Sequence, residues 1–182
     1  MKSESSRSRE LFVFRHAKSA WDDPALTDYD RPLNRRGEQD APRMGRWLAS
    51  RGLVPALLVS SPAERARLTA VAVAAQLDIK SKKILWDERI YMADVGSLAE
   101  VLAGVPRENT PVMLVGHNPG LEQLVLCLAG EGAGALPRPP PGFLKTAGFA
   151  RLRLPADWSK LTRRSGLLLE LMVPKQLPHA VR

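Results

Sequence analysis

The chain has 182 residues, of which 45% are apolar and 25% charged, a mix that predicts one globular domain and excludes a disordered chain, a collagen and a coiled-coil rod. No apolar run reaches the roughly 18 residues of a membrane helix, and the polar start MKSESSRSRE lacks a signal-peptide core, so we expect a cytoplasmic protein with no membrane partner. The 27 Lys and Arg residues exceed the 19 Asp and Glu residues, and the resulting net charge of +8 fits anionic partners as well as simple solubility.

Strands and helices are predicted to alternate along most of the chain. Residues 1–9 are expected to form a disordered tail and residues 10–182 a single domain. Short apolar runs predict strands at 11–14, 56–60, 83–86 and 112–115, and later near 149–154 and 167–173. Periodic apolar residues and helix-start signals predict helices at 37–51, from Ser61 to about Leu77, from Ser97 to Gly104, and at 119–129. The Gly/Pro-rich segment 130–142 is either a lid or a connector.

This order of elements predicts the α/β fold class, with a mostly parallel sheet of about six strands covered by helices. The last two strands lack an intervening helix, so we expect them to form an antiparallel edge. Two serines are expected to cap helices. Ser61 precedes Pro62, which suits the first helical position, and Ser97 precedes a shorter apolar run.

Two of the three histidines closely follow predicted parallel strands. His16 comes two residues after LFVF, and His117 comes two residues after VMLV. Open α/β sheets bind ligands at the carboxyl ends of their strands, so both imidazoles are expected in one site. Two histidines without H-x-x-x-H or C-x-x-C spacing make a poor zinc site, and no metal is expected. His179, near the end of the chain, is expected to lie on the surface.

Arginines at the same edge favour an anionic ligand. Arg15 precedes His16, and Arg65 follows the strand predicted at 56–60. Guanidinium groups make forked contacts to phosphoryl oxygens, although either arginine alone also fits a solvated surface. Other phosphate chemistries lack their motifs. The chain has no G-x-x-x-x-G-K-[ST] loop, and Cys127 has no arginine six residues later and is expected to be an inert core residue.

Five segments together resemble the histidine phosphatase superfamily: RHAKSAW, DRPLNRRG, SSPAERARLTA, DERIY and VGHNPG. The first and last are similar to the SixA-type phosphohistidine phosphatase branch, and the resemblance runs from about Leu11 to Pro174. It implies a phosphoglycerate mutase-like fold, a three-layer α/β/α sandwich without a large cap domain. It also implies a phosphatase that uses no cofactor and no metal.

The resemblance assigns roles to four residues. His16 would be the nucleophile and carry a transient phosphohistidine, while Arg15, Arg65 and His117 would hold the phosphoryl group. A histidine with an unperturbed pKa near about 6.5 is available as a neutral imidazole at neutral pH, and we expect its far ring N–H to bond a backbone carbonyl. The cationic groups would stabilise the charge of an in-line transfer, and water would then hydrolyse the phosphoenzyme.

Three further site residues are assigned by the resemblance with less direct matches. Glu88, in DERIY, matches the glutamate that larger mutases use as acid or base, although a surface or ion-pair role fits it equally. Ser19 and Asn118 are expected to bind phosphate, and Asn118 stands where acid-phosphatase relatives carry an aspartate. Asp22 stands where the mutases have a phosphate-contacting asparagine, and its carboxylate is expected to turn away from phosphate.

The expected function is hydrolysis of protein phosphohistidine, with a phosphorylated protein as partner. Two alternatives stay open: a small phosphate ester as the substrate of the same site, and a phospho-binding module that does not turn over. The net charge and the basic segment 151–164 also suggest nucleic-acid binding. However, Leu152, Leu154 and Trp158 in that segment resemble core anchors more than a stacking platform, so no specific nucleic-acid partner is expected. The oligomeric state stays open.

Overall fold

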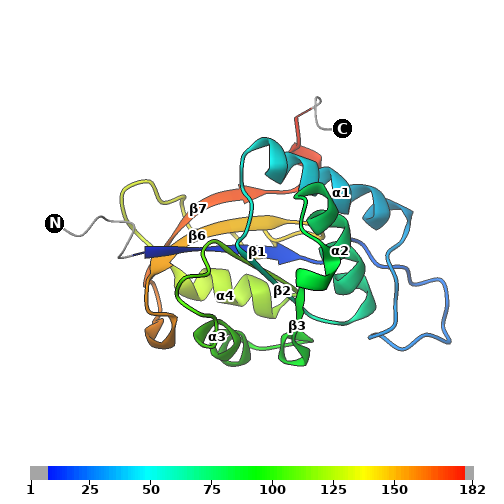
Figure 1. Ribbon diagram of the computed structural model, residues 1–182, viewed down its shortest axis with the longest axis horizontal. Coiled ribbons are helices and arrows are strands. Elements are labelled where there is room, and N and C mark those ends of the chain that lie inside the picture. Colours follow the sequence, from blue (N-terminus) through cyan, green and yellow to red (C-terminus); the bar gives the residue numbers. More distant parts are fainter. Residues whose placement is uncertain (1–7, 179–182) are drawn as a thin grey trace.

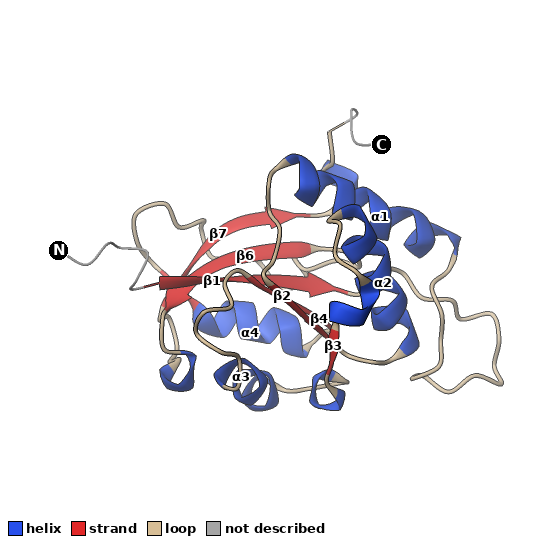
Figure 2. Ribbon diagram, in the orientation of Figure 1, coloured by secondary structure: helices blue, strands red, loops and turns tan. Residues whose placement is uncertain are grey.

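The computed structural model describes residues 8–178 as three layers, with a sheet between two pairs of helices (Figure 1 and Figure 2). The strands are β1 (Ser8–Arg15), β2 (Leu57–Ser60), β3 (Leu85–Trp86), β4 (Val112–Gly116), β5 (Ala129–Gly130), β6 (Phe149–Pro155) and β7 (Gly166–Met172). The helices are α1 (Arg35–Ser50), α2 (Glu64–Gln76), α3 (Val95–Ala103) and α4 (Gly120–Leu128). Within these residues the strands lie in the order β3-β2-β4-β1-β6-β7-β5. The predicted α/β/α sandwich is confirmed, and the two-residue β5 is the strand beyond the six expected.

The sheet is parallel through β1, β2, β3 and β4, whereas β6 runs antiparallel to both β1 and β7, as expected for the last two predicted strands. Between β2 and β3 the chain forms only α2 and a short turn, so no large cap domain is present there. β1 begins at Ser8, so Ser8 and Arg9, which were expected in the disordered tail of residues 1–9, belong to the sheet. Residues 1–7 and His179 lie outside the described part. Over residues 8–178, no helix has the length and apolar character to cross a membrane.

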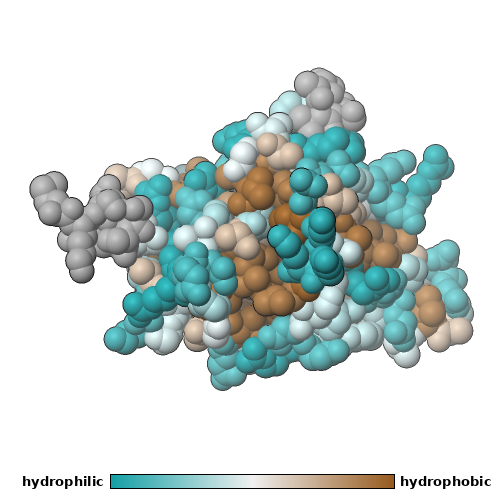
Figure 3. Space-filling view, viewed as in Figure 1, coloured by the Kyte–Doolittle hydropathy of each residue, from teal (hydrophilic) through white to brown (hydrophobic). Residues whose placement is uncertain are grey.

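Each face of the sheet has its own core. Successive side chains of a strand point to opposite faces. Phe12 and Phe14 therefore pack toward α1 and α2, while Leu11 and Val13 pack toward α3 and α4. All four are fully buried, because helices cover both faces of the parallel part. The edge strand β3 differs, since both of its side chains are exposed. Figure 3, which views the molecule from the same side as Figure 1, shows apolar surface in its middle, over β2 and β3.

The register of the parallel strands brings both histidines to one edge. β4 ends at Gly116, and the backbone N–H of His16 donates to the Gly116 carbonyl at 3.0 Å. On the other side of β4, the backbone N–H of Ser61 donates to the Val115 carbonyl at 3.0 Å. Three neighbouring strands thus deliver His16, Ser61 and His117 to the same edge of the sheet.

Two helix starts differ from their predictions. α2 begins at Glu64, and its N-cap residue, Ala63, provides no side-chain hydrogen bond. Ser61 is not the cap because its backbone still pairs with β4. α3 is capped by Asp94, whose Oδ1 accepts the backbone N–H of Ser97 at 2.8 Å. A Ser-Pro pair and an isolated serine are thus ambiguous helix signals when the turn that precedes the helix also needs polar groups.

Gly37, in the first turn of α1, is packed against the loop that follows His16. A Cβ at this position would overlap the carbonyl oxygen of Lys18. Gly37→Ala is therefore expected to lower the free energy of unfolding by about 1–3 kcal/mol and to reduce activity by displacing this loop. Gly96→Ala is the matched control, because a Cβ there meets only Asp94 Oδ1, at 3.5 Å, and alanine favours the helix. Denaturant titration of both variants checks this, and equal stabilities would contradict it.

Candidate active site

His16 directly follows β1, and one of its ring nitrogens makes a hydrogen bond to the backbone. Its Nδ1 lies 2.7 Å from the carbonyl oxygen of Ala17. A carbonyl can only accept, so Nδ1 carries the proton and Nε2 carries the free lone pair. The expected hydrogen bond to a backbone carbonyl is thus present. Thr69 Oγ1 fixes the same turn, since it accepts the Ala17 N–H at 2.9 Å and donates to the Arg65 carbonyl at 2.6 Å.

His117 lies beside His16, with 5.1 Å between the two ring centroids. Both residues are buried, at 8% exposure for His16 and 3% for His117. His117 Nε2 is 2.9 Å from Ser61 Oγ, and its Nδ1 is buried without a hydrogen-bond partner among the described residues. The structure therefore brings the two predicted histidines together and assigns Ser61 to His117 rather than to a helix cap.

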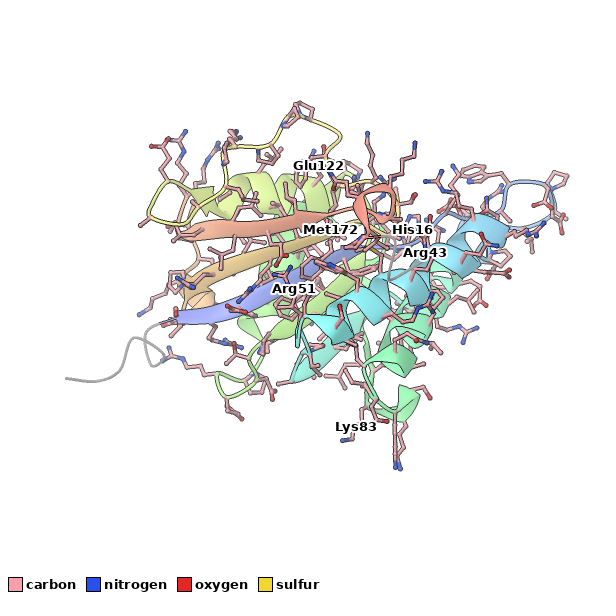
Figure 4. The ribbon with its side chains drawn as sticks, turned by 90° about the horizontal axis from the view of Figure 1, so that it is seen from above. His16, Arg43, Arg51, Lys83, Glu122 and Met172 are labelled. Carbon is pink, nitrogen blue, oxygen red and sulfur yellow. The ribbon has the colours of Figure 1, made fainter. Side chains whose placement is uncertain are left out.

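Arg15 and Asn118 are tied to the chain segment that ends the Gly/Pro-rich loop. Arg15 Nη1 and Asn118 Nδ2 both donate to the Leu144 carbonyl, at 2.9 and 3.0 Å. The Glu122 carboxylate holds this segment by accepting the backbone N–H groups of Gly142, at 2.6 Å, and of Leu144, at 3.2 Å. Figure 4 labels His16 at the end of β1 and Glu122 on α4. The segment that ends this loop thus anchors Arg15 beside His16.

Arg65, in the first turn of α2, is buried and is held by a residue that the sequence did not single out. Its Nη1 donates to the backbone carbonyl of Asp28, and its Nη2 donates to Asp28 Oδ2 at 2.9 Å. The hydroxyl of Tyr91 donates to the same Oδ2 at 2.8 Å. The Tyr91 ring stands edge-on to His117, with 5.4 Å between centroids. Asp28 and Tyr91 therefore connect Arg65 to the second histidine.

Glu88 and Ser19 lie further from this cluster in the hydrogen-bond network. Glu88 is exposed, and both its carboxylate oxygens accept from the Tyr29 hydroxyl at 3.1 Å. Tyr29 in turn packs edge-on against Tyr91, with 4.9 Å between centroids. Ser19 is buried, and its Oγ accepts from Trp21 Nε1 at 3.1 Å. Among the described residues, Glu88 is thus linked to the histidines through two tyrosines.

Burial lowers the pKa of both imidazoles far below the ordinary 6.5, because desolvation penalises the cation. The pKa of His16 falls to about 4, where the hydrogen bond to Ala17 opposes the shift and the charges of Arg65 and Arg15 add to it. The pKa of His117 falls to about 3, with the neighbouring His16 and Arg65 adding to burial. Both rings are therefore neutral at pH 7, which is the state that a nitrogen nucleophile needs.

These pKa shifts predict a loss of stability on mild acidification. Unfolded histidines take up protons near pH 6.5, whereas folded His16 and His117 do so only near pH 4 and 3. Between pH 6.5 and 4 the unfolded state binds more protons than the folded state. The free energy of unfolding therefore falls as the pH is lowered, by at most about 1.4 kcal/mol per pH unit for each histidine. The Tm should drop between pH 7.5 and 5.5, and less in His16→Gln. An equal or larger drop in the variant would contradict this assignment.

Two neutral imidazoles and two guanidinium groups at the carboxyl edge of a parallel sheet form the arrangement expected of a histidine phosphatase. Residues 11–101 match the sequence profile of the Histidine phosphatase superfamily (branch 1). The chain belongs to this superfamily and is a phosphatase. Within residues 8–178, no three His, Cys, Asp or Glu side chains are grouped so that they could hold a metal ion.

Several solved structures and curated proteins are similar to this chain in fold or in sequence. A SixA protein from Agrobacterium tumefaciens is 31% identical, with a TM-score of 0.72 over 91% of this chain and 98% of that one. The protein histidine phosphatase SixA in complex with tungstate, 24% identical, shares the fold with a TM-score of 0.76 over 93% of this chain and 99% of that one. An uncharacterized Mycobacterium tuberculosis protein is 34% identical over 88% of this chain and 99% of its own length. An uncharacterized chloroplast protein of Arabidopsis thaliana is 38% identical over 69% of this chain, and the match spans 61% of that protein.

Proposed function

We propose that this phosphatase hydrolyses phosphohistidine on proteins in the cytoplasm, through a covalent intermediate on His16. The observation that carries the proposal is the hydrogen bond from His16 Nδ1 to Ala17, because it leaves a neutral Nε2 with a free lone pair. That nitrogen belongs to a ring that lies 5.1 Å from the His117 ring. A buried, neutral imidazole among cationic side chains is suited to attack a phosphorus atom rather than to bind phosphate as a cation.

In the first step, His16 Nε2 forms a bond to phosphorus while the bond from phosphorus to the leaving atom breaks, and that electron pair goes to the leaving group. Arg15, Arg65 and His117 surround the equatorial oxygens and stabilise their charge. A guanidinium has five N–H donors. Arg65 uses two on Asp28, so three remain for phosphoryl oxygens. In the second step, water forms a bond to phosphorus and gives one proton to solvent, while the P–N bond breaks and its electron pair returns to His16 Nε2.

Three other residues have supporting roles in the proposal. Ser19 Oγ accepts from Trp21, so its hydroxyl proton is free to be donated to phosphate. Asn118 spends its amide N–H groups on Leu144 and Glu122, so it supports the phosphate site by holding the segment that anchors Arg15. Glu88 stays the proposed acid or base, linked to the histidines through Tyr29 and Tyr91.

An open site supports a protein substrate over a small ester. The chain places only α2 and a short turn between β2 and β3, where a cap domain would enclose a small ligand. The relative from Agrobacterium tumefaciens carries the name of a phosphohistidine phosphatase. A phosphorylated imidazole is also a good leaving group once its second nitrogen is protonated. This substrate therefore needs little acid catalysis, and Glu88, which is exposed and linked to the histidines indirectly, is sufficient to supply it.

A comparison of substrates tests the proposed function. The purified protein is given a phosphohistidine-bearing protein and a panel of sugar and nucleotide phosphates. We expect kcat/KM for the phosphohistidine protein to exceed that for every small ester by about 10-fold or more. A small ester that is turned over more efficiently would replace the protein substrate in the proposal and leave the catalytic residues in place. Phosphate binding without turnover of either class would contradict catalysis by this site.

A further inference from the structure

We infer that Asp28 makes the site selective for phosphoryl groups carried on nitrogen, by setting a carboxylate beside the leaving group, a ring that is cationic until its bond to phosphorus breaks. This inference rests on the proposed function and names the residue that would give the site its substrate class. Asp28 belongs to the loop between β1 and α1, and its contacts reach two separate parts of the site, Arg65 on α2 and Tyr91 before α3.

The Asp28 carboxylate is fixed although its loop is exposed. Oδ2 accepts from Arg65 Nη2 at 2.9 Å and from the Tyr91 hydroxyl at 2.8 Å. The backbone carbonyl of Asp28 accepts from Arg65 Nη1. Tyr91 also touches His117 through its ring. Both a buried guanidinium and a tyrosine therefore hold this carboxylate at the site.

The exposures place Asp28 at the opening of the site. The Asp28 side chain is 45% exposed, against 6% for the Arg65 side chain that it binds. His16, at 8% exposure, is more buried than Asp28. A phosphorylated side chain must enter from solvent, and in-line transfer puts the leaving atom opposite the attacking nitrogen. The leaving group therefore points toward the opening, where the Asp28 carboxylate lies.

Charge at that place acts in opposite directions on two kinds of substrate. When a phosphate ester is cleaved, the departing oxygen gains negative charge, and a nearby carboxylate opposes this. When a phosphohistidine with a protonated ring is cleaved, the P–N bond breaks and its electron pair neutralises the ring. The imidazole leaves neutral, and no proton has to be transferred in this step. The carboxylate attracts the ring while it is cationic and so favours its binding and protonation, whereas it repels the departing oxygen of an ester. Asp28 therefore discriminates between the two classes in kcat/KM.

The Asp28 carboxylate stays ionised in this setting. Burial alone would raise its pKa, but the hydrogen bonds from Tyr91 and Arg65, together with the Arg65 charge, outweigh burial and lower the pKa below its ordinary value. The negative charge is therefore present throughout the range in which the imidazole rings of a substrate titrate. The second carboxylate of this region, Glu88, is occupied by the Tyr29 hydroxyl.

Asp28→Asn separates charge from positioning. Asparagine keeps the backbone carbonyl that Arg65 binds and offers a side-chain oxygen to Arg65 and Tyr91, so only the charge is removed. Asp23→Asn is the matched control. It makes the same charge change in the same exposed loop, where Asp23 Oδ1 accepts the Ala25 N–H at 2.9 Å and asparagine can do the same. The full chain carries each substitution, and kcat/KM is measured on a phosphohistidine-bearing protein and on p-nitrophenyl phosphate.

We expect Asp28→Asn to lower kcat/KM for the phosphohistidine protein by about 10-fold or more beyond any effect that it has on kcat/KM for p-nitrophenyl phosphate. Asp23→Asn should change neither. An equal loss on both substrates would show that Asp28 only positions Arg65 and would overturn the inference, as would no change on either. These results leave the proposed function intact. A wild-type protein inactive on phosphohistidine but active on the ester would overturn the proposed function and the inference together.

Discussion

Replacing His16 with alanine is expected to lower kcat by roughly 10³-fold or more and to abolish the covalent phosphoenzyme. The reason is geometric, because Nε2 of this ring is the atom that the hydrogen bond from Nδ1 to Ala17 leaves free for attack. The neighbouring His117 has its Nε2 beside Ser61 Oγ, so it is not set up in the same way. The measurement is single-turnover hydrolysis of a phosphohistidine-bearing protein.

The alanine variant also needs evidence that its fold is intact. His16 is the first residue beyond β1, and its backbone N–H keeps the bond to Gly116, so far-ultraviolet circular dichroism should be unchanged. Removing a buried imidazole with a pKa near 4 should also flatten the dependence of Tm on pH. A folded variant that keeps more than about a tenth of the wild-type rate would mean that another group attacks phosphorus.

Arg65→Lys is expected to lower kcat/KM by about 100-fold or more, although the charge is retained. The guanidinium must bind Asp28 and phosphoryl oxygens at once, and an ammonium has neither enough donors nor the forked geometry. Arg67→Lys is the matched control, because Arg67 lies two residues along α2 and pairs with Glu64 on the surface at 2.7 Å. It should stay within about 2-fold of wild type. Equal losses of kcat/KM in both variants would contradict a role for Arg65 in binding the phosphoryl group.

The strands and the two histidines could be predicted because local sequence determines them. Apolar runs mark buried strands, and a histidine placed just after a parallel strand must come to the carboxyl edge of the sheet. His16 and His117 therefore meet because β1 and β4 pair in parallel. No knowledge of side-chain packing was required for that step.

Asp28 and Tyr91 could not be predicted in the same way. Each lies in a connecting segment, and only the tertiary fold brings the Asp28 carboxylate to Arg65 and to the Tyr91 hydroxyl. The prediction that Ser61 caps a helix was wrong for a related reason. Its sequence resembles a helix cap, but its backbone extends the pairing of β2 with β4, and its hydroxyl partners His117. Polar residues in loops have several possible partners, and pattern alone does not choose among them.

The covalent intermediate itself gives the most direct measurement. Wild-type protein is mixed with a phosphohistidine-bearing substrate, quenched without acid, and examined by mass spectrometry and by phosphorus and nitrogen NMR. We predict one phosphoryl group, on residue 16 and on Nε2, because Nδ1 is committed to the Ala17 carbonyl. A phosphoryl group on His117, on Nδ1 of His16, or on no residue during continued turnover would contradict nucleophilic attack by His16 Nε2.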